Sequence, residues 1–151
     1  MNPDSTGEIG RDGGFRLECG ACGSDNGFAP LATLCPECGS PQLVRYSDPT
    51  TPGGELARRW ADRPRGMWRF REIMPLVGEE QPVSLGEGDT PLLPLPSIGE
   101  ELGLRLLVKD EGQNPTGSFK DRGISAAVTR AVHDGVEDFV IPSAGNAGAA
   151  L

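Results

Sequence analysis

Lysine, histidine and aromatic residues are scarce in this chain of 151 residues, and long apolar runs are absent. The chain has two lysines and one histidine, and its 22 acidic and 14 basic residues give a formal net charge of −8. A surface this negative repels nucleic acid and anionic lipid, so we expect neither as a partner. No apolar run approaches the roughly 20 residues that span a bilayer, and the N-terminus lacks a signal-peptide pattern, which predicts a cytoplasmic protein.

All four cysteines lie in two CxxC pairs that are separated by 12 residues and are each followed by glycine. Two such knuckles direct four thiolates at one centre, which is typical of a structural zinc site with a closed coordination shell. Iron in the same four-sulfur site is the main alternative. Disulfides are typical of exported proteins, and this N-terminus shows no signal-peptide pattern. Thioredoxin-like redox chemistry requires a CxxC pair at a strand-to-helix junction, whereas both pairs here flank a glycine-rich ribbon. We therefore expect zinc to be held by Cys19, Cys22, Cys35 and Cys38.

Composition divides the chain into four parts. Residues 1–14 are polar and glycine-rich, which predicts a flexible tail, and residues 15–46 form the cysteine-bearing segment. Residues 47–56 are rich in Pro and Gly and are interpreted as a linker. Residues 57–151 alternate between helix and strand patterns, which predicts an α/β domain.

Proline, glycine and capping residues set the expected elements in the first part of this domain. Prolines 64 and 75 bracket a short helix whose large apolar residues are expected to pack. Ser97 and Glu100 form the pattern of a capping box for a brief helix that ends at Gly103.

The last 46 residues show a strand, helix, strand, helix order. We expect a strand at Leu106–Glu111, a helix from about Phe119 that is stopped by Gly135, a second strand over 138–142 and a helix after the "SAGNAG" loop. In an open α/β fold, loops that follow strands meet at one edge of the sheet. The two loops before the helices are therefore expected to face one pocket. The lone His133 is interpreted as a surface residue near a helix end.

One of the two lysines, Lys120, lies in the first of these loops, "NPTGSFKDRG". Ser118 can cap the helix that follows, so Lys120 is expected on its first turn. The positive end of the helix dipole disfavours an ammonium there, and a neutral amine is a nucleophile suited to Schiff-base chemistry with an aldehyde cofactor. The neighbouring carboxylate of Asp121 would instead favour the charged form of the Lys120 amine. The alternative interpretation is that Lys120 is an ordinary solvated lysine.

The second loop, "PSAGNAG", contains Ser143, Gly145, Asn146 and Gly148. Successive backbone N–H groups in such a loop can bind a carboxylate or phosphate, and Asn146 offers an amide to a ring hydroxyl. The alternative is a glycine-rich turn that only connects strand to helix.

Together, "NPTGSFKDRG" and "PSAGNAGAAL", preceded by "SLGEGDTPLL" and "LVKDEGQ", resemble the N-terminal part of the threonine synthase family of pyridoxal-phosphate enzymes. The resemblance covers residues 15–151, because a zinc-ribbon-like extension precedes some members. It implies fold type II, an open twisted sheet with helices, here preceded by a small zinc ribbon. Dehydratases and cysteine synthases share only a shorter core around the lysine.

The resemblance also implies roles for individual residues. Lys120 corresponds to the Schiff-base lysine of pyridoxal 5′-phosphate, with Phe119 beside it at the cofactor, and Asn146 corresponds to the asparagine that binds the cofactor's phenolic oxygen. Ser143, Ala144 and Gly145 correspond to the loop that holds the substrate carboxylate. The implied reaction converts O-phosphohomoserine and water to threonine and phosphate.

The family's phosphate-binding loop and the partner of its pyridine nitrogen have no counterpart in these 151 residues. We therefore expect a fragment that is inactive alone and that forms a homodimer when full-length. Two other functions fit the residues: another pyridoxal-phosphate lyase, such as a serine or threonine dehydratase, or a non-catalytic zinc-ribbon interaction module with an enzyme remnant.

Overall fold

The computed structural model of the protein describes residues 15–27, 30–46 and 52–151. The predicted tail at 1–14 and residues 47–51 of the predicted linker lie outside these ranges. In the described part of the chain, no helix has the length and apolar character needed to cross a membrane.

The cysteine-bearing segment, residues 15–46, is called the ribbon below. Its strands β1 (Phe15–Cys19) and β2 (Gln42–Tyr46) pair antiparallel, with Phe15 opposite Tyr46. Alternate residues of β1 face inward, because side chains alternate between the two faces of a strand. Its three buried side chains are those of Phe15, Leu17 and Cys19.

Helix α1 (Gly53–Asp62) and the 3-10 helix η1 (Met67–Ile73) follow the ribbon. Residues 53–56 belong to the predicted linker, but they form the first turn of α1. Leu56 is buried, and Glu55 forms an ion pair with Arg59 one turn later. The helix ends at Arg63, whose extended backbone is the conformation that a following proline favours. The predicted short helix between the two prolines is confirmed as η1, and its Phe70 ring contacts Trp60 edge to face at 5.0 Å.

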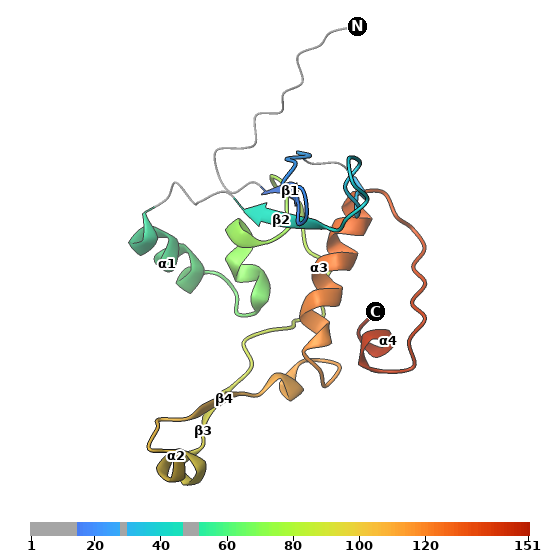
Figure 1. The fold of residues 1–151 in the computed structure, drawn as a ribbon. Coiled ribbons are helices and arrows are strands. Elements are labelled where there is room, and N and C mark those ends of the chain that lie inside the picture. Colours follow the sequence, from blue (N-terminus) through green and yellow to red (C-terminus); the bar gives the residue numbers. More distant parts are fainter. Residues whose placement is uncertain (1–14, 28–29, 47–51) are drawn as a thin grey trace, which may run out of the picture.

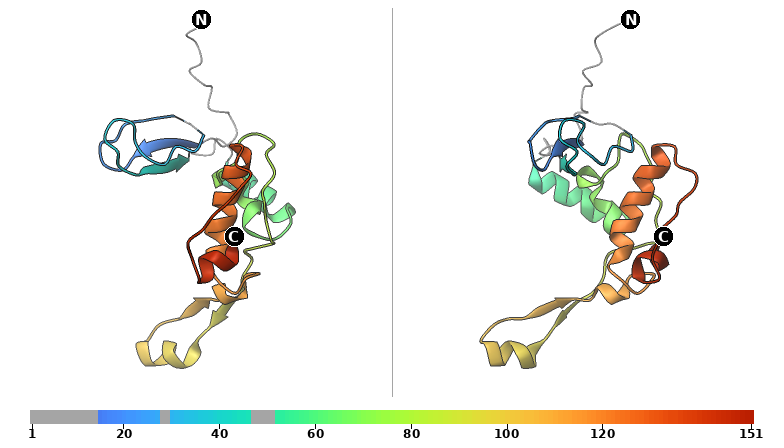
Figure 2. Two further views of the ribbon diagram at one scale, coloured as in Figure 1. Left: turned by 90° about the vertical axis from the view of Figure 1, so that its right-hand side faces the viewer. Right: turned by 45° about the vertical axis from the view of Figure 1, so that its right-hand side comes forward.

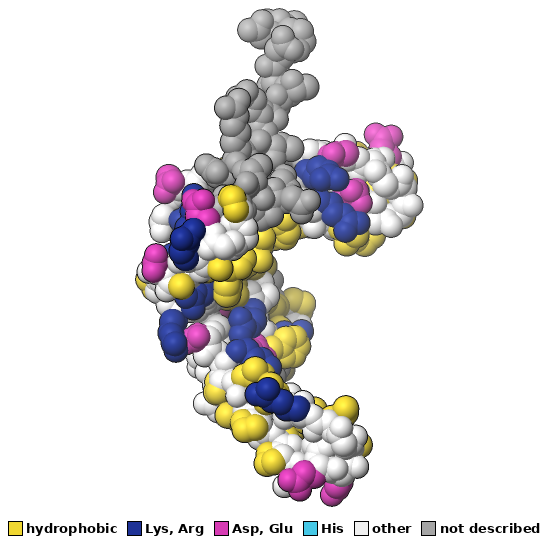
Figure 3. Space-filling model, turned by 90° about the vertical axis from the view of Figure 1, so that its left-hand side faces the viewer, with side chains coloured by type: hydrophobic (Ala, Val, Ile, Leu, Met, Phe, Trp, Pro, Cys, Tyr) yellow, Lys and Arg dark blue, Asp and Glu magenta, His cyan; other side chains and the backbone are white. Residues whose placement is uncertain are grey.

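Strand β3 (Leu92–Pro94), helix α2 (Pro96–Leu102) and strand β4 (Leu107–Lys109) form an arm that projects from the rest of the molecule (Figures 1 and 2). The predicted capping box is wrong: Pro96 starts the helix, Leu95 is its N-cap, and no side chain caps it. Gly103 ends α2 in the left-handed conformation, as predicted. Hydrophobic side chains are exposed along the arm (Figure 3); they include Leu92, Leu93, Ile98 and Leu102.

The predicted strand Leu106–Glu111 is confirmed as the shorter β4, after which the chain forms the 3-10 turn η2 (Glu111–Gln113). Helix α3 (Lys120–His133) then crosses the centre of the molecule, and Gly135 follows its end with a φ of +89° (Figure 1). The short helix α4 (Asn146–Ala150) lies beside α3 (Figure 2). Both helices were expected.

The strand predicted over 138–142 is wrong, because these residues are extended but pair with no strand of the described chain. A strand is defined by its hydrogen-bonded neighbour, and Val140 instead has 95% of its surface exposed. The α/β class is confirmed by the mixture of helices and strands. Within the described residues the strands form two small antiparallel sheets, β1–β2 and β3–β4.

Candidate functional site

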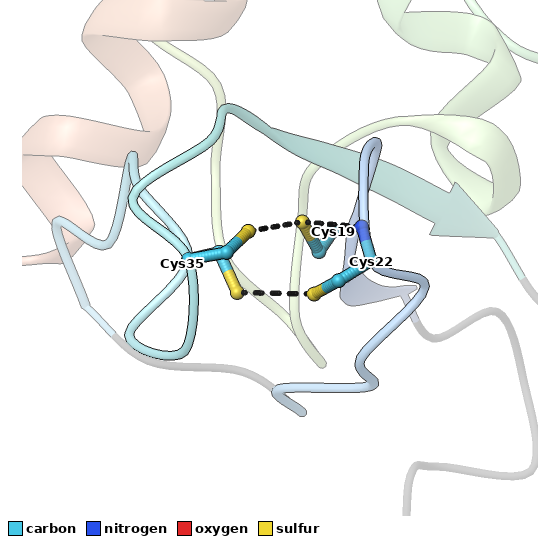
Figure 4. Close-up of side chains that lie close together, drawn as sticks. Cys19, Cys22 and Cys35 are labelled. Carbon is cyan, nitrogen blue, oxygen red and sulfur yellow. Dashed lines mark hydrogen bonds between the residues drawn. The ribbon is translucent and has the colours of Figure 1, made fainter.

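The ribbon brings its four cysteine sulfurs together. All four Sγ atoms lie within 4.8 Å of one another, with 3.4 Å between Cys19 and Cys38 and 3.8 Å between Cys22 and Cys35. Figure 4 shows side chains of the two pairs facing each other across the gap between the knuckles. Tetrahedral zinc with Zn–S bonds of about 2.3 Å requires sulfurs about 3.8 Å apart. The donor set and its spacing therefore fit a four-sulfur metal site.

Backbone groups around the cysteines support this arrangement. The backbone N–H of Cys22 donates to the sulfur of Cys19 at 3.3 Å, and the Ser24 hydroxyl lies 3.1 Å from the sulfur of Cys22. The Ser24 side chain and backbone, followed by Cys19 and Cys38, lower the pKa of Cys22 to about 6. This favours the thiolate, which is the form that binds metal. All four cysteines have free thiols in the structure.

Lys120 is the first residue of α3 and its side chain is exposed. Phe119 is the N-cap, and the buried Ser118 accepts a hydrogen bond from the backbone N–H of Lys120 at 3.2 Å. The Nζ atom lies 4.8 Å from the centroid of the exposed Phe119 ring. The amine is therefore accessible to a ligand while its backbone is held at the start of the longest helix in the described part of the chain.

Residues 114–119, called the lysine loop below, are fixed to α3 by a buried carboxylate. Asp121 has 2% of its surface exposed, and it accepts hydrogen bonds from the backbone N–H of Thr116 at 2.8 Å and from the Thr116 hydroxyl. The side-chain oxygen of Asn114 accepts from the backbone N–H of Gly88 at 3.0 Å. The lysine loop is therefore tied at one end to its own helix and at the other to residues 84–90.

An ion pair joins η2 to α3 immediately beside this loop. Arg122 binds both carboxylate oxygens of Glu111, at 2.6 and 2.8 Å, and the Thr90 hydroxyl also donates to Glu111. Arg122, with smaller contributions from Thr90 and Asn114, lowers the pKa of Glu111 to about 2. A bidentate pair of this kind fixes the orientation of both side chains as well as their separation.

A second carboxylate, Glu87, is buried with only 1% of its surface exposed. It accepts hydrogen bonds from Trp68 Nε1 at 2.7 Å, from the Leu85 backbone N–H at 2.9 Å and from the Ser84 and Ser125 hydroxyls. Burial alone would raise the pKa of Glu87, but these hydrogen bonds outweigh it and lower the pKa. Glu87 thus joins η1, the segment 84–90 and α3.

The buried stripe of α3 is polar. Asp121, Ser125 and Thr129, spaced four residues apart, are its buried residues, and the Thr129 hydroxyl accepts from the Val83 backbone N–H at 2.9 Å. The apolar residues that recur at helical spacing along α3 are less buried: Ala127 is exposed, and Val132 has 41% of its surface exposed. The reason is that α3 packs against the loop 83–90, whose backbone groups need hydrogen-bonding partners.

The second predicted loop, residues 143–146, leads into α4, which packs against α3. The Ser143 hydroxyl accepts from the backbone N–H of Gly145 at 3.2 Å, and Asn146 is the first helical residue. A Cβ at Gly148 would lie 2.5 Å from the Ser143 carbonyl oxygen, so the loop and the helix approach more closely than any side chain allows. The packing of α4 on α3 brings both loops to α3, but within the described residues no sheet edge joins them, so the expectation that they face one pocket stays a prediction.

Sequence reasoning missed Glu87 and Glu111, and it considered Asp121 only for its effect on the charge of Lys120 and not as the carboxylate that holds the loop. Each lies in a motif that was quoted for its glycines, asparagine or lysine. A signal was present, because three acidic residues next to turn residues supply acceptors for loop N–H groups.

Comparisons with known proteins concern the part of the chain that carries both loops. Residues 83–151 match the family described as "Pyridoxal-phosphate dependent enzyme". The match covers 69 of the 151 residues. The chain is also similar to proteins named threonine synthase: it is 40% identical over 88% of its length to that of Methanocaldococcus jannaschii, 34% over 91% to that of Methanosarcina acetivorans and 46% over 54% to that of Halalkalibacterium halodurans. The predicted resemblance is confirmed.

The share of each chain that these matches cover leads to two further points. A match over 91% of the chain necessarily spans the cysteine-bearing segment, so the similarity to the Methanosarcina protein is not confined to the lysine region. The chain spans 33% of the length of each archaeal relative and 23% of the Halalkalibacterium protein. The description of the matched family names pyridoxal phosphate as the cofactor of its enzymes.

Proposed function

We propose that this chain supplies the cofactor-binding lysine of a pyridoxal-phosphate-dependent lyase that converts O-phosphohomoserine and water to threonine and phosphate. The observation that carries the proposal is the placement of Lys120, an exposed primary amine on the first residue of α3 behind a loop that buried Asp121 fixes in place. A nucleophile held on a rigid element reaches its target without an ordering cost at the moment of reaction.

Lys120 has two tasks in this proposal. Its amine would hold the cofactor, and when not bound to the cofactor the same amine would move protons at the substrate Cα and Cβ. The bound cofactor supplies an electron sink for the carbanion at Cα. Phe119, whose ring lies next to the amine, contributes an apolar surface at the cofactor.

The residues 143–146 orient the ligands. Ser143, Ala144 and Gly145 would bind the substrate carboxylate through the Ser143 hydroxyl and the Ala144 N–H, with the Gly145 N–H exchanging its bond to Ser143 for one to the ligand. Asn146 would donate its side-chain amide to the cofactor's phenolic oxygen. The close approach of Gly148 to Ser143 supports this role, because it holds the loop against the start of α4.

The four cysteines of the ribbon hold one zinc ion with a structural task. Two knuckles supply all four ligands, so no coordination position remains for a substrate or water. The small ribbon buries few apolar side chains, so metal binding and folding of this segment are expected to be coupled.

The test joins this chain to the remaining two thirds of the Methanocaldococcus jannaschii threonine synthase, loads the fusion protein with pyridoxal phosphate and reduces it with borohydride. Peptide mass spectrometry is expected to find the pyridoxyl group on Lys120. A Lys120→Ala fusion should take up no label, whereas Lys109→Ala, which removes the other lysine, should be labelled as before. Label on Lys109, or on neither lysine of a fusion that is folded by circular dichroism, contradicts the proposal.

The substrate is tested on the same labelled fusion protein. Release of phosphate from O-phosphohomoserine with formation of threonine is expected. Deamination of serine or threonine without phosphate release would instead assign the dehydratase reaction. A fusion that is labelled on Lys120 and turns over neither substrate would retain the cofactor assignment and overturn the substrate assignment.

A further inference from the structure

The ribbon contacts the far end of α3 from Lys120. The backbone N–H of Leu31, which lies between the two cysteine pairs, donates to Asp134 Oδ2 at 3.0 Å across 103 residues of sequence. Figure 1 shows the loops of the ribbon beside this end of α3, and the same end of the helix borders the cysteines in Figure 4. Leu31 makes this contact through its backbone, since its side chain is exposed.

Asp134 occupies a position where its charge needs compensation. It is the C-cap of α3, and a carboxylate at a helix C-terminus is repelled by the negative end of the helix dipole. Its side chain is nevertheless only 5% exposed. Arg130, one turn earlier, binds Asp134 Oδ1 at 2.9–3.0 Å, and Leu31 supplies a donor to the other oxygen.

The helix side of this contact is built from two segments. Arg130 also binds both oxygens of Glu80, at 2.8 and 3.1 Å, and His133 places Nε2 2.8 Å from the Gln81 carbonyl oxygen. The groups that face Leu31 are thus part of a connected network across α3 and the segment 80–81. This network holds Asp134 in the orientation in which its Oδ2 atom accepts the hydrogen bond from the Leu31 N–H.

The ribbon side depends on the second cysteine pair. Leu31 has a φ of +56°, a conformation that a leucine adopts only when its surroundings enforce it. The residues that follow are fixed by Gln42, whose backbone N–H donates to Thr33 and whose side chain donates to Leu34, and Cys35 closes the knuckle through its hydrogen bond with Ser40. The position of the Leu31 N–H is therefore set by a loop that ends at a metal-binding cysteine.

We propose that metal binding by the four cysteines controls the contact between Leu31 and Asp134, so that metal occupancy stabilises the C-terminal turns of the helix that begins with Lys120. The inference rests on the proposed metal site and is independent of the proposed reaction. Without metal, the second cysteine pair loses its geometry and the strained backbone of Leu31 relaxes. Asp134 then loses the hydrogen bond from the Leu31 N–H. Linkage requires the reverse effect as well: loss of Asp134 must weaken metal binding by the same factor.

Hydrogen exchange with mass spectrometry tests the first half on the chain as it is. Zinc-bound protein, with zinc content confirmed by elemental analysis, is compared with protein treated with a chelator. We expect zinc removal to speed amide exchange in the ribbon and also in the last two turns of α3, by about fivefold or more. Zinc removal that speeds exchange in the ribbon alone overturns the inference and leaves the metal site standing. Absence of zinc binding overturns both.

A variant tests the second half. Asp134→Ala should weaken zinc binding by about five- to tenfold, the effect expected for losing one typical hydrogen bond, and should abolish the response of α3 to zinc. Asp138→Ala, which removes a nearby exposed carboxylate, is the matched control and should change neither. An Asp134→Ala protein in which α3 still responds to zinc contradicts the inference.

Discussion

The buried carboxylate of Asp121 binds the backbone N–H and the hydroxyl of Thr116, so the acidic neighbour of Lys120 serves the lysine loop. A carboxylate that accepts hydrogen bonds from a loop fixes the loop and has its own charge satisfied. The pairing explains how an exposed lysine can have a well-defined backbone position.

Asp121→Ala is expected to lower the free energy of unfolding by about 2 kcal/mol, because it removes a buried carboxylate and leaves the half-buried Thr116 donors without an acceptor. Urea denaturation measures this loss. The same change at the exposed Asp138 should cost less than about 0.5 kcal/mol. Equal effects of the two substitutions would show that Asp121 does not hold the loop.

The ion pair of Glu111 and Arg122 predicts a pH dependence of stability. The folded pKa of Glu111 is about 2, below its ordinary value of 4.5, so the pair contributes stability above pH 4.5 that is lost as the pH falls toward 2. After allowance for partial solvent exposure, we expect this contribution to be on the order of 1–2 kcal/mol.

A carboxyl NMR titration isolates Glu111 from Glu72, whose pKa Arg63 also lowers to about 2. Arg122→Met should raise the pKa of Glu111 toward 4.5 and leave that of Glu72 unchanged. A pKa of Glu111 that stays near 2 in Arg122→Met would assign the shift to Thr90 and Asn114 alone.

The ribbon is expected to contain one zinc ion per chain, measured by elemental analysis of reduced protein. Replacing Cys19 or Cys35 by serine removes a buried ligand and should abolish stoichiometric binding and unfold the ribbon, because metal and folding energies are coupled in such segments. Ser40→Ala, a nearby change that keeps all four sulfurs, should retain the metal. Reduced, zinc-replete protein that contains neither zinc nor iron contradicts the site.

Gly148→Ala should displace the 143–146 loop, since its Cβ would lie 2.5 Å from the Ser143 carbonyl oxygen. In the fusion protein described above, we expect weaker pyridoxal-phosphate binding, measured by the absorbance of the bound cofactor. Gly123→Ala is the matched control, because a Cβ at this position on α3 meets nothing within 4 Å, and alanine favours the helix by up to about 1 kcal/mol.

Asn146→Ala tests the proposed hydrogen bond to the cofactor. Removing the amide should shift the absorbance of the bound cofactor or weaken its binding, because a hydrogen bond at the phenolic oxygen tunes the ring. An unchanged spectrum together with unchanged turnover would reduce Asn146 to a helix-start residue.

Local features that depend on a few neighbouring residues could be predicted from the amino-acid sequence. The paired CxxC knuckles predicted a four-sulfur cluster, Gly103 and Gly135 marked helix ends, and the motif around Lys120 predicted both a helix start and the enzyme family. Each of these rests on turn chemistry or ligand spacing within a short stretch. Such local signals do not depend on how the rest of the chain folds.

The buried face of α3 and the contacts that hold the lysine loop depend on how distant segments pack together. The apolar positions favoured one face, yet the buried stripe is Asp121, Ser125 and Thr129, because the loops packed against it present backbone and carboxylate groups that need partners. The absence of a strand at 138–142 has the same origin, since a strand forms only against a neighbour. Contacts such as Leu31 with Asp134 join residues 103 apart, a separation at which no local pattern indicates the partner.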